Sequence, residues 1–161
     1  MIIAARLWNS NFNQLFALAK VFFKKPLFII LTLNATRKTI RTCNSNFGKA
    51  HHRNTPANAF RHALWNYLIC EKCYQVSGSV EKVTDWSKKI TDLHERLAPN
   101  RELAQRMDLH NNQIGRAMFK EHVLERIDIV TVLLEKMKEA VKIYSIEDIE
   151  RARNKMVFIE N

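Results

Sequence analysis

Turn-forming residues are scarce in this chain, whose 161 residues include only three glycines and three prolines. A β-rich fold needs a turn every few residues, and glycine and proline are the strongest turn signals. Long stretches without them are typical of helices. Hydrophobic residues make up 47% of the chain, which is enough for one core. We therefore expect an all-α fold, as a single compact domain of six or seven helices.

Caps, breakers and apolar spacing predict where these helices lie. Thr55 and Pro56 predict an N-cap and a first helical residue. Ser145 and Asp148 have the spacing of a capping box that opens a short last helix. Residues 46–54 are expected to form a loop, and 156–159 a brief strand or an extended tail. The expected helices before the last one span about 10–25, 27–44, 56–76, 80–97 and 101–122, with a sixth following to about residue 144.

The positive charge of the chain belongs to its N-terminal part. Residues 1–70 carry ten Lys and Arg and no acid, whereas residues 71–161 carry 16 basic and 16 acidic residues. We divide the chain into a basic, amphipathic helical segment at 1–50 and a helical domain at 51–161. The segment is expected to pack on the domain or to lie on an anionic membrane surface, with core packing preferred. A basic flank that only adds solubility explains the charge equally well, and nucleic acid is a less favoured partner.

Neither a membrane span nor a secretory signal is expected. The uninterrupted apolar run Leu27–Leu33 is only seven residues long, far short of a bilayer span. The cysteines, Cys43, Cys70 and Cys73, are odd in number, which favours reduced thiols and a cytoplasmic setting, with peripheral membrane attachment as an option. Cys70 and Cys73 have a redox or zinc spacing, but no second pair completes a zinc site. Buried structural cysteines are the preferred interpretation.

A polar row follows the helix expected at 56–76. Asn58, His62 and Asn66 are four residues apart, so they share one face, and Arg61 and Trp65 form the adjoining row. The rest of this helix is largely apolar and predicts burial on several sides. An unsatisfied buried amide or imidazole costs about 1–3 kcal/mol, so the polar row needs partners.

Two further motifs provide candidate partners. His94 and Glu95 lie near the end of their helix, and Asp108, Asn111, Asn112 and Gly115 follow the spacing of another single face. Glycine inside a helix costs about 1 kcal/mol relative to alanine. Its presence at 115 predicts a close backbone approach by the helix that carries Asn58 and Asn66.

Three polar helical faces within 60 residues predict a common site between the central helices. The candidate catalytic residues are His62, His94, Glu95, Asp108 and His110, and the candidate substrate-binding residues are Asn58, Arg61, Asn66, Asn111, Asn112 and Arg116. A divalent metal is a candidate cofactor, with His62, Asp108 and His110 as its ligands. No HExxH motif is present, and His94 and Glu95 point about 100° apart on a helix. Metal-free acid/base chemistry therefore fits the same residues, and so does a buried network that only fixes helix register.

The succession N-x-x-R-H-x-x-W-N, H-E and D-x-H-N-N-x-x-G-R resembles an uncharacterised bacterial domain family, a domain of unknown function. The resemblance covers about Asn54–Phe119, less than half of the chain, and residues 1–50 have no match to it. It implies an enzymatic domain but no particular reaction. The motif order also resembles HD-type metal phosphohydrolases, with His94 and Glu95 in place of the His-Asp pair, although the usual intervening histidines are absent. An HNH-type nuclease would need a β-hairpin, and none is predicted.

Two hypotheses for function follow. The first is a small helical hydrolase, with or without a metal, that acts on a phosphoester or another anionic substrate. The alternative is a binding module that uses the basic N-terminal segment on an anionic membrane or nucleic acid. A single pocket that joins the polar residues would favour the enzyme, whereas a sealed and fully paired network would favour the module.

Overall fold

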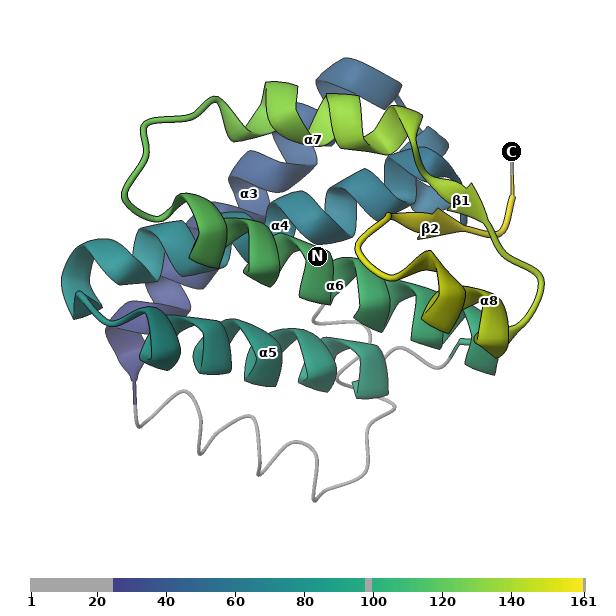
Figure 1. Ribbon diagram of the computed structural model, residues 1–161. Helices are drawn as coiled ribbons and strands as arrows, with labels where there is room; N and C mark the ends of the chain where they lie inside the picture. The colour runs from purple at the N-terminus through teal and green to yellow at the C-terminus, as the bar shows by residue number, and fades with distance from the viewer. Residues whose placement is uncertain (1–24, 98–99, 161) are drawn as a thin grey trace.

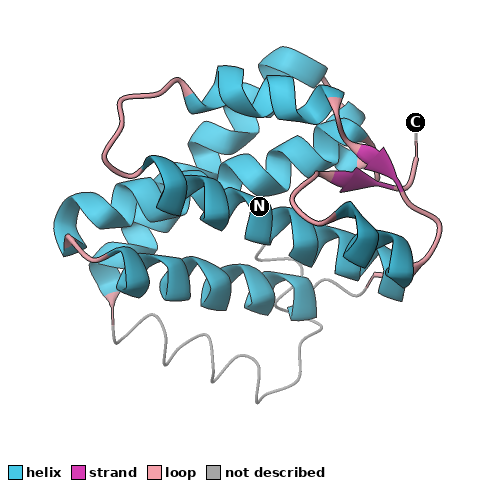
Figure 2. Cartoon of the chain, viewed as in Figure 1, coloured by secondary structure: helices cyan, strands magenta, loops and turns pink. Residues whose placement is uncertain are grey.

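The computed structural model describes residues 25–97 and 100–160, and almost all of this part of the chain is helical (Figures 1 and 2). The described residues form six α-helices, one 3-10 helix and a pair of two-residue strands, so the all-α prediction is confirmed. The helix expected at 10–25 lies outside the described residues, except for its last residue. The elements are α3 (Pro26–Phe47), η1 (Ala50–His52), α4 (Pro56–Ser77), α5 (Val80–Leu97), α6 (Glu102–His122), α7 (Ile129–Lys138), β1 (Val141–Lys142), α8 (Ile146–Ala152) and β2 (Val157–Phe158).

Helix α4 is the centre of the fold. It packs against α3, α5, α6 and α7, and Figure 1 shows these helices arranged around it. Phe60, Leu64, Leu68 and Ile69 of α4 are fully buried, and together with neighbours from the surrounding helices they form the main core. Because α4 is enclosed on several sides, its polar residues are buried as well. This burial places the predicted polar row inside the molecule.

Helices α4 and α6 approach each other very closely at Gly115. A Cβ atom on Gly115 would lie only 2.0 Å from the carbonyl oxygen of Ala63 and 2.9 Å from its Cα. Only glycine fits at this position, so the predicted close approach is confirmed. The contact brings the polar faces of the two helices together.

Several predicted boundaries differ from the structure. Thr55 precedes α4, but its hydroxyl donates to the carbonyl oxygen of Ala50 and does not cap the helix. The helix expected to reach residue 144 ends at Lys138, and Val141–Lys142 forms a strand that runs parallel to β2. The capping box of Ser145 and Asp148 is confirmed.

Helix α3 contributes to the same core as α4, through Ile29, Ala35 and Cys43. Its outer face leaves large apolar side chains exposed. None of the helices within 25–97 and 100–160 is long and apolar enough to cross a bilayer. The three cysteines are free and buried, as predicted, and burial raises the pKa of the Cys70 and Cys73 thiols to about 12. Burial and a raised pKa both favour the uncharged thiol, as expected for structural cysteines.

Candidate functional site

His62 lies at the centre of a buried acidic cluster between α4, α5 and α6. Its Nε2 atom is 3.2 Å from Asp108 Oδ1, and its Nδ1 atom is 3.8 Å from Glu95 Oε1. One nitrogen or oxygen atom from each of the three residues lies within 4.8 Å of the others, and no residue of the three is more than 5% exposed. We call His62, Glu95 and Asp108 the acidic centre.

A pair of asparagines determines the orientation of the His62 ring. Asn112 Oδ1 lies 3.0 Å from His62 Nδ1 and also accepts a hydrogen bond of 2.7 Å from Asn66 Nδ2. Because an amide oxygen can only accept, His62 Nδ1 carries the proton and Nε2 carries the lone pair. The Arg61 guanidinium donates to Nε2 over 2.8 Å. Burial, and then the charge of Arg61, hold the pKa of His62 well below its usual range, so the ring is neutral.

Asn66, which donates to Asn112, also forms hydrogen bonds with residues of α5 and α6. Its Oδ1 atom accepts hydrogen bonds from Arg116 (2.8 Å), Ser87 (2.9 Å) and Thr91 (3.3 Å). The sequence interpretation missed Ser87 and Thr91. Both precede Glu95 at four-residue spacing, so counting back along the helix from Glu95 would have found them.

Asp108 is a strongly perturbed carboxyl group. Burial first, and the nearby charge of Glu95 second, raise the pKa of Asp108 to about 8, while Arg61 opposes the shift. Among residues 25–97 and 100–160, Asp108 Oδ1 and Asn58 Oδ1 accept no hydrogen bond and Asn112 Nδ2 donates none, although all three atoms are buried. Native proteins rarely leave such atoms unpaired. All three atoms belong to residues of the predicted polar faces, which makes these faces a candidate ligand site.

A surface pocket of about 400 Å³ adjoins the acidic centre through Glu95, which lines the pocket. Arg116 lines it too, while its guanidinium holds Asn66. Lys88 at the pocket forms an ion pair with Asp92. The lining contains three basic and two acidic side chains, and consists of Lys88, Asp92, Glu95, Arg96, Gln105, Leu109, Gln113 and Arg116.

His110 and Asn111 lie on a different side of α6. His110 Nε2 is 2.9 Å from the Lys155 carbonyl oxygen, and the Asn111 side chain both donates to and accepts from the backbone of Val157. These contacts hold β2 against α6. Residues 108 and 110 point about 200° apart on a helix, so they do not face one centre. Of the three predicted metal ligands, the structure brings together His62 and Asp108, and places Glu95 beside them in the position expected for His110.

The remaining predicted residues flank the acidic centre. Asn58 is buried one turn before His62 on the same face of α4. His94 is half-buried, and its ring packs edge-on against Trp65 with the ring centroids 5.2 Å apart. A positive charge on His94 would lower the pKa of His62 further, so His94 is close enough to influence the centre electrostatically.

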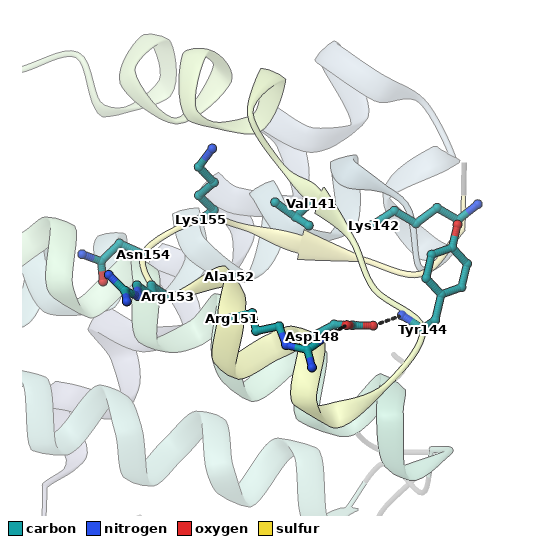
Figure 3. Close-up of a pocket in the computed structure, with 9 residues that line it drawn as sticks. All are labelled: Val141, Lys142, Tyr144, Asp148, Arg151, Ala152, Arg153, Asn154 and Lys155. Carbon is teal, nitrogen blue, oxygen red and sulfur yellow. Dashed lines mark hydrogen bonds and ion pairs between the residues drawn. The ribbon is translucent and has the colours of Figure 1, made fainter.

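A second pocket, of about 750 Å³, lies at the C-terminal end of the chain, between β1, α8 and the loop that leads to β2 (Figure 3). Its basic lining residues are Lys142, Arg151, Arg153 and Lys155. Asp148 is the acidic residue of its lining, and its carboxylate accepts the backbone N–H of Tyr144 and of Ser145. Figure 3 shows Asp148 turned toward Tyr144. The Asp148 carboxylate is engaged in capping α8. This larger pocket therefore does not offer the acid/base residues found at His62.

Comparison with known proteins agrees with the resemblance seen in the motifs. The model of a family described as a domain of unknown function (DUF6973) matches residues 19–141. This span contains all three motif segments, and it extends the resemblance to the whole of α3, where none was expected. No curated protein and no solved structure matches the chain.

Proposed function

We propose that this chain, which belongs to the DUF6973 family of domains of unknown function, is a hydrolase that acts on a phosphoester or a related anionic substrate. One observation carries the proposal: Glu95 belongs both to the acidic centre and to the wall of the neighbouring pocket. His62 and Asp108 are buried and do not line the pocket, so a substrate there meets the acidic centre through Glu95.

The acidic centre has the groups that hydrolysis requires. A neutral imidazole beside two carboxyl groups can accept a proton from a water molecule or hold a metal ion that activates one. The water oxygen would form a bond to phosphorus, the bond to the leaving oxygen would break, and the leaving oxygen would take up the proton that the water had given to the acidic centre. The hydrogen bond from His62 to Asn112 keeps the lone pair on Nε2, and Arg61 must release this atom before Nε2 can take part in the chemistry.

The neighbouring pocket supplies groups that bind an anion. Lys88 and Arg96 are exposed at the pocket, and Arg116 is half-buried within it. Guanidinium and ammonium groups donate strong hydrogen bonds to phosphate oxygens. We assign substrate binding to these three side chains, because each can contact an anion in the pocket that Glu95 lines.

The hydrolase proposal is tested with the full chain and three generic substrates: a phosphomonoester, a phosphodiester and a fluorogenic phospholipid. We expect turnover of at least one. Replacing both Lys88 and Arg96 by alanine should raise KM about tenfold with little change in kcat, because these groups bind the anion but do not touch the reacting bond. Lys89→Ala, at an exposed lysine outside the pocket, is the matched control. Absence of turnover with all three substrates would contradict the proposal.

The outer face of α3 favours a second candidate function, binding to an anionic membrane surface. This face combines exposed apolar and basic side chains, and the first 70 residues contain no acid. A helix surface of this kind binds anionic lipid by apolar burial and by charge. The exposed apolar residues are Leu27, Ile30, Leu33 and Ile40, and the exposed basic residues are Arg37, Lys38 and Arg41.

Sedimentation with lipid vesicles tests the membrane candidate. The chain should bind vesicles rich in phosphatidylserine more tightly than neutral vesicles, and added salt should weaken the binding. Replacing Ile30 and Leu33 by glutamine should weaken it severalfold, because apolar area would no longer be buried in lipid. Leu124→Gln changes an exposed leucine that lies after α6 and should have no effect. Equal binding by the α3 variant and the Leu124 variant would exclude this role for α3.

A further inference from the structure

We propose that the acidic centre binds one divalent transition-metal ion, with His62, Glu95 and Asp108 as its ligands. The inference deepens the proposed function, since it concerns the same site. It differs from the ligand set expected from sequence, because Glu95 takes the place of His110.

The distances at the acidic centre suit a small metal ion. Ligand atoms bound tetrahedrally at ~2.1 Å from zinc lie ~3.4 Å apart. His62 Nε2 and Asp108 Oδ1 are already 3.2 Å apart, and the three residues offer ligand atoms within 4.8 Å of one another. Small rotations of the Glu95 and Asp108 side chains would bring all three atoms onto one ion.

Asp108 provides the second, independent observation. Its Oδ1 atom is buried and faces His62 Nε2, and no donor in the described part of the chain forms a hydrogen bond to it. Nε2 carries a lone pair, so an ionised Asp108 oxygen repels it unless a positive charge, from a proton or from a cation, lies between the two atoms. A bound cation would supply that charge.

The residue types select the class of metal. One imidazole nitrogen and two carboxylate oxygens suit Zn²⁺ or Mn²⁺, whereas Ca²⁺ and Mg²⁺ prefer ligand sets made of oxygen alone. Metal-bound histidines usually donate their other N–H to an acceptor that fixes the ring, and Asn112 Oδ1 provides this acceptor for His62. Three protein ligands leave a coordination position for water, as in catalytic zinc sites.

Arg61 is the group that competes with the metal ion. Its guanidinium donates to His62 Nε2, and also to the His51 carbonyl oxygen over 2.7 Å. A metal ion on Nε2 would displace the Arg61 guanidinium from that atom, and the His51 carbonyl oxygen would remain as its acceptor. Metal binding therefore requires the Arg61 side chain to move, together with the small rotations of Glu95 and Asp108.

The inference is tested by calorimetric titration of the full chain, freed of metal with a chelator, using Zn²⁺ and Mn²⁺ separately. We expect one ion per chain for at least one metal. Glu95→Gln and Asp108→Asn, which preserve side-chain shape, should weaken binding about 100-fold or more, because each removes an anionic ligand. His110→Ala is the matched control and should leave the affinity unchanged. Circular dichroism verifies that each variant is folded.

Three results would overturn the inference: no binding of either ion, wild-type affinity in both carboxyl variants, or an equal loss of affinity in His110→Ala. The titration contains no substrate, so it is independent of the hydrolase assay. Metal binding without hydrolysis supports the metal site and removes the proposed function. Hydrolysis by a chain that binds no metal supports the proposed function and overturns the metal site.

Discussion

Replacing Gly115 by alanine should lower the free energy of unfolding by about 3 kcal/mol, or prevent folding altogether. The new Cβ would lie 2.0 Å from the Ala63 carbonyl oxygen; the Cβ is fixed to the backbone of α6, and the oxygen belongs to the backbone of α4. Neither can rotate away, so α4 and α6 must separate, at the cost typical of an overpacked core. Urea denaturation followed by circular dichroism measures the effect.

Control substitutions can show that the loss of stability in Gly115→Ala comes from the clash between α4 and α6. Ala117→Ser alters an exposed residue of α6 and should change the free energy of unfolding by less than about 0.5 kcal/mol. Adding Ala63→Gly to Gly115→Ala should restore little, because the clash is with backbone atoms of residue 63. Wild-type stability in Gly115→Ala would show that the two helices do not approach as closely as described.

Gly115 also shows why the helical arrangement could be predicted. An unfavourable glycine in a polar helical face has few physical explanations, and close packing against the Asn58–Asn66 row is one of them. The described bounds of α5, Val80–Leu97, agree with the expected range of about 80–97, because Ser77-Gly78-Ser79 and Pro99 are strong breakers. Local signals of this kind are present in the sequence itself.

The composition of the site depends on information that one helix does not contain. Asp108, His110 and Asn111 belong to one motif, yet Asp108 faces His62 while the other two hold β2. Which side of α6 faces α4 and which faces the C-terminal strand is a property of the tertiary packing. Spacing along α6 could therefore identify candidate residues, but it could not divide them between the acidic centre and the strand contact.

Chain segments with weak signals were predicted least well. The break between α6 and α7 lacks both glycine and proline, so the sequence offered no turn residue there. Asp128 caps α7 by accepting the backbone N–H of Val130, which is the signal that marks a new helix. Two-residue strands such as β1 also have too few positions for an alternating pattern to be seen.

Replacing Asp108 by asparagine should abolish most of the proposed activity while leaving the protein folded. The amide keeps the shape of the carboxyl group but can neither exchange a proton nor act as an anionic metal ligand. Loss of such a group lowers the rate by about 10²–10⁴-fold. The free energy of unfolding should not fall, because Asp108 Oδ1 receives no hydrogen bond within the described part of the chain and the carboxyl lies near the negative charge of Glu95. A functional group that adds no stability is common at active sites.

The measurement pairs kcat/KM for the best substrate of wild type with thermal unfolding. Asp85→Asn, an exposed aspartate on α5, should change neither quantity. A destabilised Asp108→Asn variant would assign the residue to the structure, and full activity in it would remove Asp108 from the chemistry.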